Sequence, residues 1–202
     1  IAGVTKAVDD LMIAVGKEMG DPHEAVSSLI KLSTIYNDDK NVTADKIIDI
    51  GNAFQKLTSS GIATGQYLIE FAEQMGGIRG ITKMGIADVL GLGAALETLG
   101  QTAHVSSTAL SQVIVKLFTD QQKYADITKN SLGDFQKMLH DDVLGTLLLV
   151  AEAIKGDSGE MEHFFEGMVD MHAKGYRAVG VVGDLASNIN LAKEQMKKAN
   201  LA

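Results

Sequence analysis

Residues 85–100, Gly-Ile-Ala-Asp-Val-Leu-Gly-Leu-Gly-Ala-Ala-Leu-Glu-Thr-Leu-Gly, carry the pattern that decides the fold class. Apolar side chains recur there every three or four residues, for example at Ile86, Val89 and Leu96. That spacing puts them on one face of an α-helix. Glycine suits the left-handed position just past a helix end, so Gly100 is the predicted stop. The stretch therefore predicts one helix that ends at a glycine turn.

The same helical period recurs along the chain, and sustained alternation of apolar and polar residues does not occur. One proline in 202 residues also suits a helical chain, because proline breaks the backbone ladder of a helix. We therefore predict an all-α fold of about ten short-to-medium helices joined by Gly-rich turns. The apolar stripes that define them begin at Val4, Val26, Ile47, Tyr67, Ile86, Leu110, Leu132, Val143, Met161, Val179 and Ile189.

Several start signals fix where these helices should begin. Pro22 suits the first turn of a helix, where its missing N–H costs nothing. Thr43 is a plausible N-cap after the polar loop 37–41, and Ser106 or Ser107 is the expected start of a later helix. These signals predict helix boundaries as well as helix content.

We predict two helical lobes, 1–80 and 81–202, with one continuous all-α domain as the alternative. Three glycines between residues 76 and 80 should make the most flexible connection in the chain. The sequence starts at Ile1 rather than methionine and ends in mid-pattern, so we expect it to be a piece of a longer protein.

Some glycines fall inside the apolar stripes, where each costs about 1 kcal/mol of helix propensity. Two explanations are open. Either the missing side chain allows close helix–helix approach, which we favour, or the helices are built to unravel. The glycines concerned are Gly51, Gly91, Gly93, Gly145, Gly180 and Gly183.

Charge and composition argue against several classes of function. The formal net charge of −8 repels phosphate backbones, so we expect no direct nucleic-acid recognition. The absence of cysteine excludes disulfides, thiolate metal sites and cysteine nucleophiles. The longest apolar run, 143–151, is far shorter than the ~20 residues of a membrane-spanning helix.

Motifs that suggest chemistry have simpler explanations as structure. Gly91 and Gly93 half-match a dinucleotide fingerprint, but they lie inside a predicted helix and the third glycine is missing. Glu160 and His163 have the spacing of a di-iron ligand pair, but the chain has no second Glu-x-x-His. In His140-Asp141-Asp142, an aspartate should cap the following helix.

We therefore expect no catalytic, cofactor-binding or metal-binding residues, no cofactor, and no enzymatic activity. The methionines at 161, 168 and 171 fit a flexible core filler, with a methionine-rich binding groove as the alternative.

Two neighbouring segments carry a resemblance to a known family. They are residues 85–100 and Ser106-Ser-Thr-Ala-Leu-Ser-Gln-Val-Ile-Val-Lys-Leu117. In order and spacing they resemble the core region of tape measure proteins of long-tailed phage or prophage, minor tail proteins in which a helix with an Ala-Leu centre ends at glycine and a Thr-Ala-Leu helix follows. Further segments extend the resemblance over residues 45–199: 49–57, 60–64, 134–139, 147–156, 175–178 and 185–188.

The resemblance implies a structural function. Members of that family lie as extended helical chains in the tail tube, set its length during assembly and leave before the genome. The implied partners are tail tube and tail assembly proteins, with self-association as a further option and membrane contact only during ejection. The implied location is the lumen of the virion tail, after assembly in the bacterial cytoplasm.

Three other readings compete with this one. A membrane-active, pore-forming helical domain would explain the small-residue helices and the apolar segment 147–154, but such surfaces usually carry basic faces and this chain is acidic. A soluble helical adaptor would bind a specific partner outside the tail. An enzyme ranks third, because only the lone Glu-x-x-His suggests it.

Overall fold

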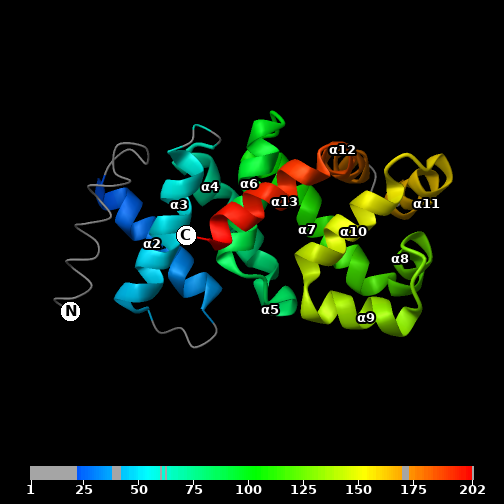
Figure 1. Cartoon of the computed structure of the whole chain (residues 1–202), viewed down its shortest axis with the longest axis horizontal. Coiled ribbons are helices and arrows are strands. Elements are labelled where there is room, and N and C mark those ends of the chain that lie inside the picture. Colours follow the sequence, from blue (N-terminus) through cyan, green and yellow to red (C-terminus); the bar gives the residue numbers. More distant parts are fainter. Residues whose placement is uncertain (1–21, 38–41, 60, 62, 170–172, 202) are drawn as a thin grey trace. The chain divides into compact units, whose positions relative to one another are not determined.

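The computed structural model describes residues 22–37, 42–59, 61, 63–169 and 173–201. Within those ranges the regular elements are helices and none is a strand (Figure 1). The predicted all-α class is confirmed. The predicted helix that begins at Val4 and most of the predicted loop 37–41 lie outside the described residues.

The chain divides into two compact units, each described by itself. Unit 1 comprises residues 1–104 and 192–202, and unit 2 comprises residues 105–191. Independent lobes at 1–80 and 81–202 stay a prediction. In chain order the described elements are α2 (Pro22–Tyr36), α3 (Ala44–Thr58), α4 (Gly65–Met75), the 3-10 turn η1 (Gly76–Ile78), α5 (Arg79–Thr82), α6 (Ile86–Thr98), α7 (Ala103–Thr119), α8 (Gln121–Ile127), α9 (Leu132–Asp141), α10 (Val143–Ile154), α11 (Ser158–Val169), α12 (Ala173–Ser187) and α13 (Ile189–Asn200).

Helix α6 is the centre of unit 1, and it is formed within the glycine-bounded stretch 85–100. Its residues from Val89 to Leu96 are buried without a break, so this helix has no solvent face along that run. It packs against α3 and α4, and α13 crosses it (Figure 1). It ends as predicted, with Gly100 in the left-handed region at φ 79°.

Small residues let the neighbours of α6 come close. A Cβ on Gly91 would lie 2.6 Å from the backbone N of Met196 on α13 and 2.7 Å from the carbonyl O of Gln195. A Cβ on Gly93 would lie 2.8 Å from Cδ1 of Phe71 on α4. The predicted close helix–helix approach is therefore confirmed at both positions.

Polar contacts fix the ends of the helices around α6. Thr43 is the N-cap of α3, as predicted, and its side chain accepts a hydrogen bond from Lys46 N at 3.4 Å. Thr64 caps α4 in the same way, and Glu97 of α6 accepts from both the backbone N–H and the hydroxyl of Thr64, each at 2.8 Å. The start of α4 is thereby tied to the end of α6.

The glycine-rich stretch 76–80 is helical, in η1 and α5, and a Cβ on Gly76 would lie 2.5 Å from Ile35 Cγ2 of α2; its predicted flexibility stays a prediction. One predicted boundary is wrong. Neither Ser106 nor Ser107 starts a helix: α7 begins at Ala103, and both serines are fully buried inside it. Serine is a good cap, but its small volume also suits a tightly packed helix face.

Unit 2 is held by aromatic and aliphatic side chains from α8 to α12. The ring of Tyr124 on α8 meets that of Phe164 on α11 edge-on, with centroids 6.3 Å apart. Other buried residues of this unit lie on α9, α10, α11 and α12: Phe135, Leu139, Leu144, Leu147, Leu148, Ala151, Ile154, Met168, Ala178, Val181, Val182 and Leu185. Helix α10 contributes most of its apolar residues to this core.

Helix α12 of unit 2 uses its glycines in two ways. A Cβ on Gly175 would collide with the carbonyl O of Met168 on α11, so this glycine permits close packing. At Gly180 and Gly183 no described atom lies within 4 Å of the position a Cβ would take. The prediction of helix–helix approach is wrong at these two positions.

Candidate functional site

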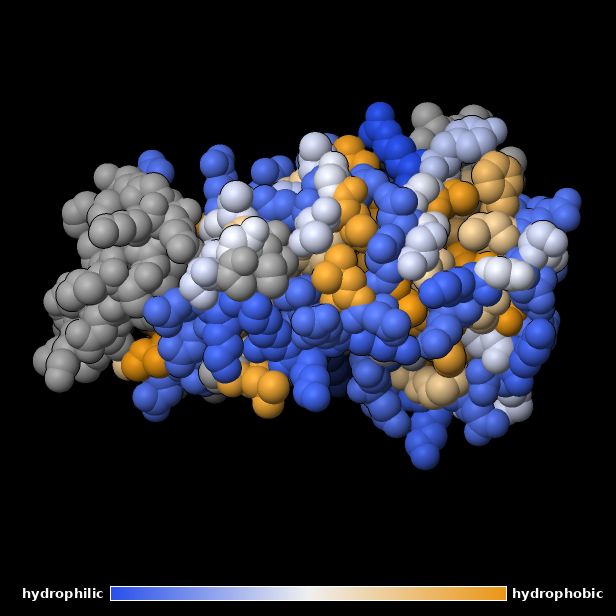
Figure 2. Space-filling view, turned by 45° about the horizontal axis from the view of Figure 1, so that its top comes forward, coloured by the Kyte–Doolittle hydropathy of each residue, from blue (hydrophilic) through white to orange (hydrophobic). Residues whose placement is uncertain are grey.

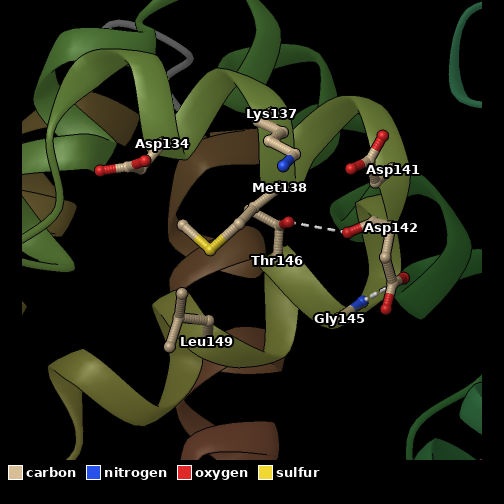
Figure 3. Close-up of a pocket in the computed structure, with 8 residues that line it drawn as sticks. All are labelled: Asp134, Lys137, Met138, Asp141, Asp142, Gly145, Thr146 and Leu149. Atoms are coloured by element: carbon tan, nitrogen blue, oxygen red, sulfur yellow. Dashed lines mark hydrogen bonds between the residues drawn. The ribbon is translucent and has the colours of Figure 1, made fainter.

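A surface hollow lies in unit 2 between α9 and α10, with a volume of about 610 Å³ (Figure 3). Helix α9 contributes its outward face and α10 its first two turns. The lining residues are Asp134, Lys137, Met138, Asp141, Asp142, Gly145, Thr146 and Leu149. We take this hollow as the candidate functional site because apolar and charged side chains meet in it.

The hollow exists because α9 and α10 share a single residue as their junction. Asp142 is the C-cap of α9 and the N-cap of α10, in an extended conformation at φ −150° and ψ 92°. Its carboxylate accepts from Gly145 N at 2.8 Å, and its carbonyl accepts from the Thr146 hydroxyl at 2.7 Å. The chain therefore turns from one helix directly into the next, and the two helices flank the hollow.

The side chains of the hollow separate by chemistry. Met138, Thr146 and Leu149 gather at its centre (Figure 3). Thr146 is buried, whereas Met138 and Leu149 are half-buried. Asp134 lies to one side of this apolar centre, and Asp141 and Asp142 lie to the other. Lys137 is the one basic residue among the lining residues. The result is an apolar floor with carboxylates at both ends.

The predicted role of the His140-Asp141-Asp142 run is confirmed, because Asp142 caps α10. His140 Nδ1 lies 3.3 Å from Asp141 Oδ1, and their side chains are 82% and 61% exposed. An ion pair so open to solvent contributes little to stability. Asp142 serves helix geometry as a cap, and the exposed carboxylates of Asp141 and Asp142 together give the hollow its negative end.

The Glu-x-x-His spacing lies on the surface of α11. His163 Nδ1 is 3.7 Å from Glu166 Oε2, and their side chains are 49% and 65% exposed. In the part of the chain that the structure describes, no three His, Cys, Asp or Glu side chains are grouped as a metal site would require. Of the three methionines, Met168 is buried, Met161 is half-buried, and Met171 lies outside the described residues.

The half-matched dinucleotide fingerprint is part of the unit 1 core. Gly91 faces the backbone of α13 and Gly93 faces the ring of Phe71. Both glycines are buried within α6, so the space that a pyrophosphate would need is filled by protein.

Two buried side-chain atoms in the described part of unit 2 have no hydrogen-bond partner, Oε1 of Gln112 and the hydroxyl of Tyr124. Burial raises the pKa of Tyr124 far above its ordinary value, and the nearby Asp120 raises it further. This tyrosine therefore stays neutral, and its ring serves the packing against Phe164.

The apolar floor of the hollow could not be predicted from the sequence. Its signal is present but weak: Asp134, Met138 and Asp141 share one face of α9, and the buried Phe135 and Leu139 lie on another. A single methionine on a polar face is ordinary. The face of α9 that carries Met138 comes to lie beside Leu149 of α10 only because the two helices meet at the single residue Asp142.

One face of the molecule is mostly polar. Figure 2 shows one face on which hydrophilic residues predominate and hydrophobic residues are visible in separate places. Among the helices described here, none is long and apolar enough to cross a membrane. The most apolar of them, α10, has 12 residues.

Comparison with known proteins gives one finding. A family model described as phage-related minor tail protein matches residues 2–171, which is most of the 202-residue chain. No curated protein and no solved structure matched the chain.

Proposed function

Because the chain belongs to the family of phage-related minor tail proteins, we propose that it is a segment of a tape measure protein. In this proposal it sets the length of the tail tube during assembly and assists genome ejection. The single observation that carries the proposal is the family match over residues 2–171. The order of the helix motifs in 85–100 and 106–117 supports the finer assignment to the tape measure.

The proposed role is structural and non-catalytic. The partners are tail tube and tail assembly proteins, and the location is the tube lumen, after assembly in the host cytoplasm. The candidate hollow supports a binding role better than a catalytic one. Its apolar centre is flanked by exposed carboxylates, and two of these already take part in helix starts: Asp142 accepts from Gly145 N, and Asp134 accepts from the hydroxyl of Ser131, the N-cap of α9.

A ruler must be extended, whereas each unit here is folded upon itself. Helices α3, α4 and α6 pack together within unit 1, and α10, α11 and α12 pack together within unit 2. We infer that these contacts open when the chain enters the tube. Small-angle scattering of the isolated chain should show a compact or two-lobed particle, and a rigid rod would contradict this inference.

The decisive experiment changes the length of the proposed ruler. Deleting these 202 residues in frame should shorten tails by about 300 Å, because a helix rises ~1.5 Å per residue. Duplicating them should lengthen tails by the same amount. Electron microscopy of assembled tails measures both changes.

The two variants control for each other, since a general assembly defect would not lengthen tails. Tails of normal length in both variants, combined with failed DNA delivery, would contradict the ruler role and favour an ejection module. Normal length with normal delivery would contradict both parts of the proposal.

A further inference from the structure

We propose that the hollow between α9 and α10 is a docking groove for a basic amphipathic segment of another protein. An apolar side chain of that segment fills the centre, and lysine or arginine residues on either side of it meet the flanking carboxylates. This inference goes beyond the proposed function, because it holds whether or not the chain sets tail length.

The centre of the groove suits an apolar side chain of variable shape. Met138 and Leu149 are only half-buried, so they keep apolar surface that a partner can cover. Methionine is unbranched and polarizable, and it adapts to different neighbours. A volume of about 610 Å³ lies within the range of ligand pockets and holds at least one large side chain.

The charges at the two ends select the flanking residues of the partner. Asp134 stands at one end, and Asp141 and Asp142 stand at the other (Figure 3). Lys137 opposes them with a single positive charge. All three aspartates are exposed, and a carboxylate that caps a helix still has lone pairs for a further donor. Complementary charge therefore favours a segment with a cation on each side of its apolar residue.

The same charges argue against two other occupants. A nucleic acid would bring phosphates to a rim of carboxylates. The basic run of this chain itself, at 193–198, lies on α13, whose backbone at Met196 packs against Gly91 within unit 1. Lys193 and Lys197 are exposed on that helix, but its apolar residues Ala192 and Ala199 are buried. The α13 helix of a folded second copy would therefore present cations without the apolar face that the centre requires, so we commit to a different protein.

The test uses the full 202-residue chain and a designed peptide. The probe is a fluorescein-labelled helical peptide of about 15 residues with a central leucine pair flanked by lysines, a length at which isolated helices begin to form. A matched peptide carries glutamate in place of lysine. Fluorescence anisotropy should show saturable binding of the lysine peptide, weakened as the salt rises to about 0.5 M, and no binding of the glutamate peptide.

Matched variants locate the binding site. The pair Asp134→Asn and Asp141→Asn leaves the Asp142 cap intact and should weaken binding about fivefold to tenfold. The pair Glu162→Gln and Glu166→Gln changes the net charge equally on the exposed face of α11, and it should change affinity less than about twofold. Leu149→Ala should weaken binding at high and low salt alike, with circular dichroism confirming that each variant is folded.

Three results would overturn the proposal. The first is equal binding of the glutamate peptide, and the second is an equal loss of affinity in the α11 control pair, which would show unspecific attraction. The third is binding of a peptide with the sequence of residues 189–201 as tight as that of the designed probe, which would make a second copy the occupant.

Discussion

Helix α6 carries Gly91 and Gly93 in its interior, and α12 carries Gly180 and Gly183 there besides the packed Gly175 near its start, but the two interior pairs have opposite surroundings. Around Gly91 and Gly93 of α6, the backbone of α13 and the ring of Phe71 occupy the space that side chains would need. Around Gly180 and Gly183 of α12, no described atom comes within 4 Å. A glycine inside a helix costs about 1 kcal/mol relative to alanine. In α6 close packing offsets that cost, and in the described part of unit 2 nothing offsets it for α12.

The comparison shows that an interior glycine is informative only together with what lies opposite it. The two helices have similar small-residue patterns in sequence, and both are amphipathic or apolar enough to be predicted as helices. Substituting alanine at each position separates packed glycines from open ones.

The largest effect is expected at Gly91. In Gly91→Ala the new methyl would collide with the backbone of α13 at Met196, and a backbone cannot rotate away as a side chain can. We expect a loss of about 3 kcal/mol in the free energy of unfolding of unit 1. Residue-resolved hydrogen exchange measures this loss of stability and reports on unit 1 and unit 2 separately. Unchanged protection of α6 would show that α13 can be displaced at no cost.

The double substitution Gly180→Ala and Gly183→Ala should change stability in the opposite direction. Each alanine adds helix propensity without a clash, so together they should raise the stability of unit 2 by about 1 to 2 kcal/mol. Thermal and urea unfolding followed by circular dichroism measure the change. A loss of stability would mean that this face is covered, and the contrast between the two helices would fail.

At Gly93 the neighbour is a ring that can shift. A methyl there lies 2.8 Å from Phe71 Cδ1, so we expect Gly93→Ala to cost about 1 kcal/mol after the gain in helix propensity. The same substitution with Phe71→Leu should recover part of the loss, because the smaller side chain leaves room. A double-mutant cycle in urea measures this coupling, and strictly additive losses would contradict the contact.

The smallest effect is expected at Gly145, in the groove. Its missing Cβ makes room for the Asp142 carboxylate that caps α10. In Gly145→Ala the carboxylate must move, and the lost cap, about 1 kcal/mol, roughly cancels the gained propensity. We expect a change within about 0.5 kcal/mol in urea unfolding. Asp142→Ala, with the full cap lost, is the matched comparison and should cost about 1 kcal/mol.

Local features of this fold could be predicted from the sequence. The stripe in 85–100 predicted α6 and its end at Gly100, and Thr43 and Asp142 cap helices as expected. Each of these depends on residues within a few positions of one another. Capping and helical period are local effects, so one sequence contains all that they need.

Features that depend on partners distant in sequence could not be predicted. Nothing near Gly91 indicates that Met196 will cover it, and nothing near Gly180 indicates that its face stays open. Ser106 has the composition of a cap, yet it is buried because α7 starts earlier. The groove likewise requires knowing that α9 and α10 meet at Asp142.

The division of unit 1 into residues 1–104 and 192–202 has a consequence for synthesis of the chain. Unit 2 is contiguous, so all of it leaves the ribosome before the last segment of unit 1. With about 100 residues between α6 and α13, translation at ~5–20 residues per second imposes a delay on the order of 5 to 20 s. During that time the face of α6 around Gly91 lacks its cover. The cover of α6 is therefore made only after the whole of unit 2 has been synthesised.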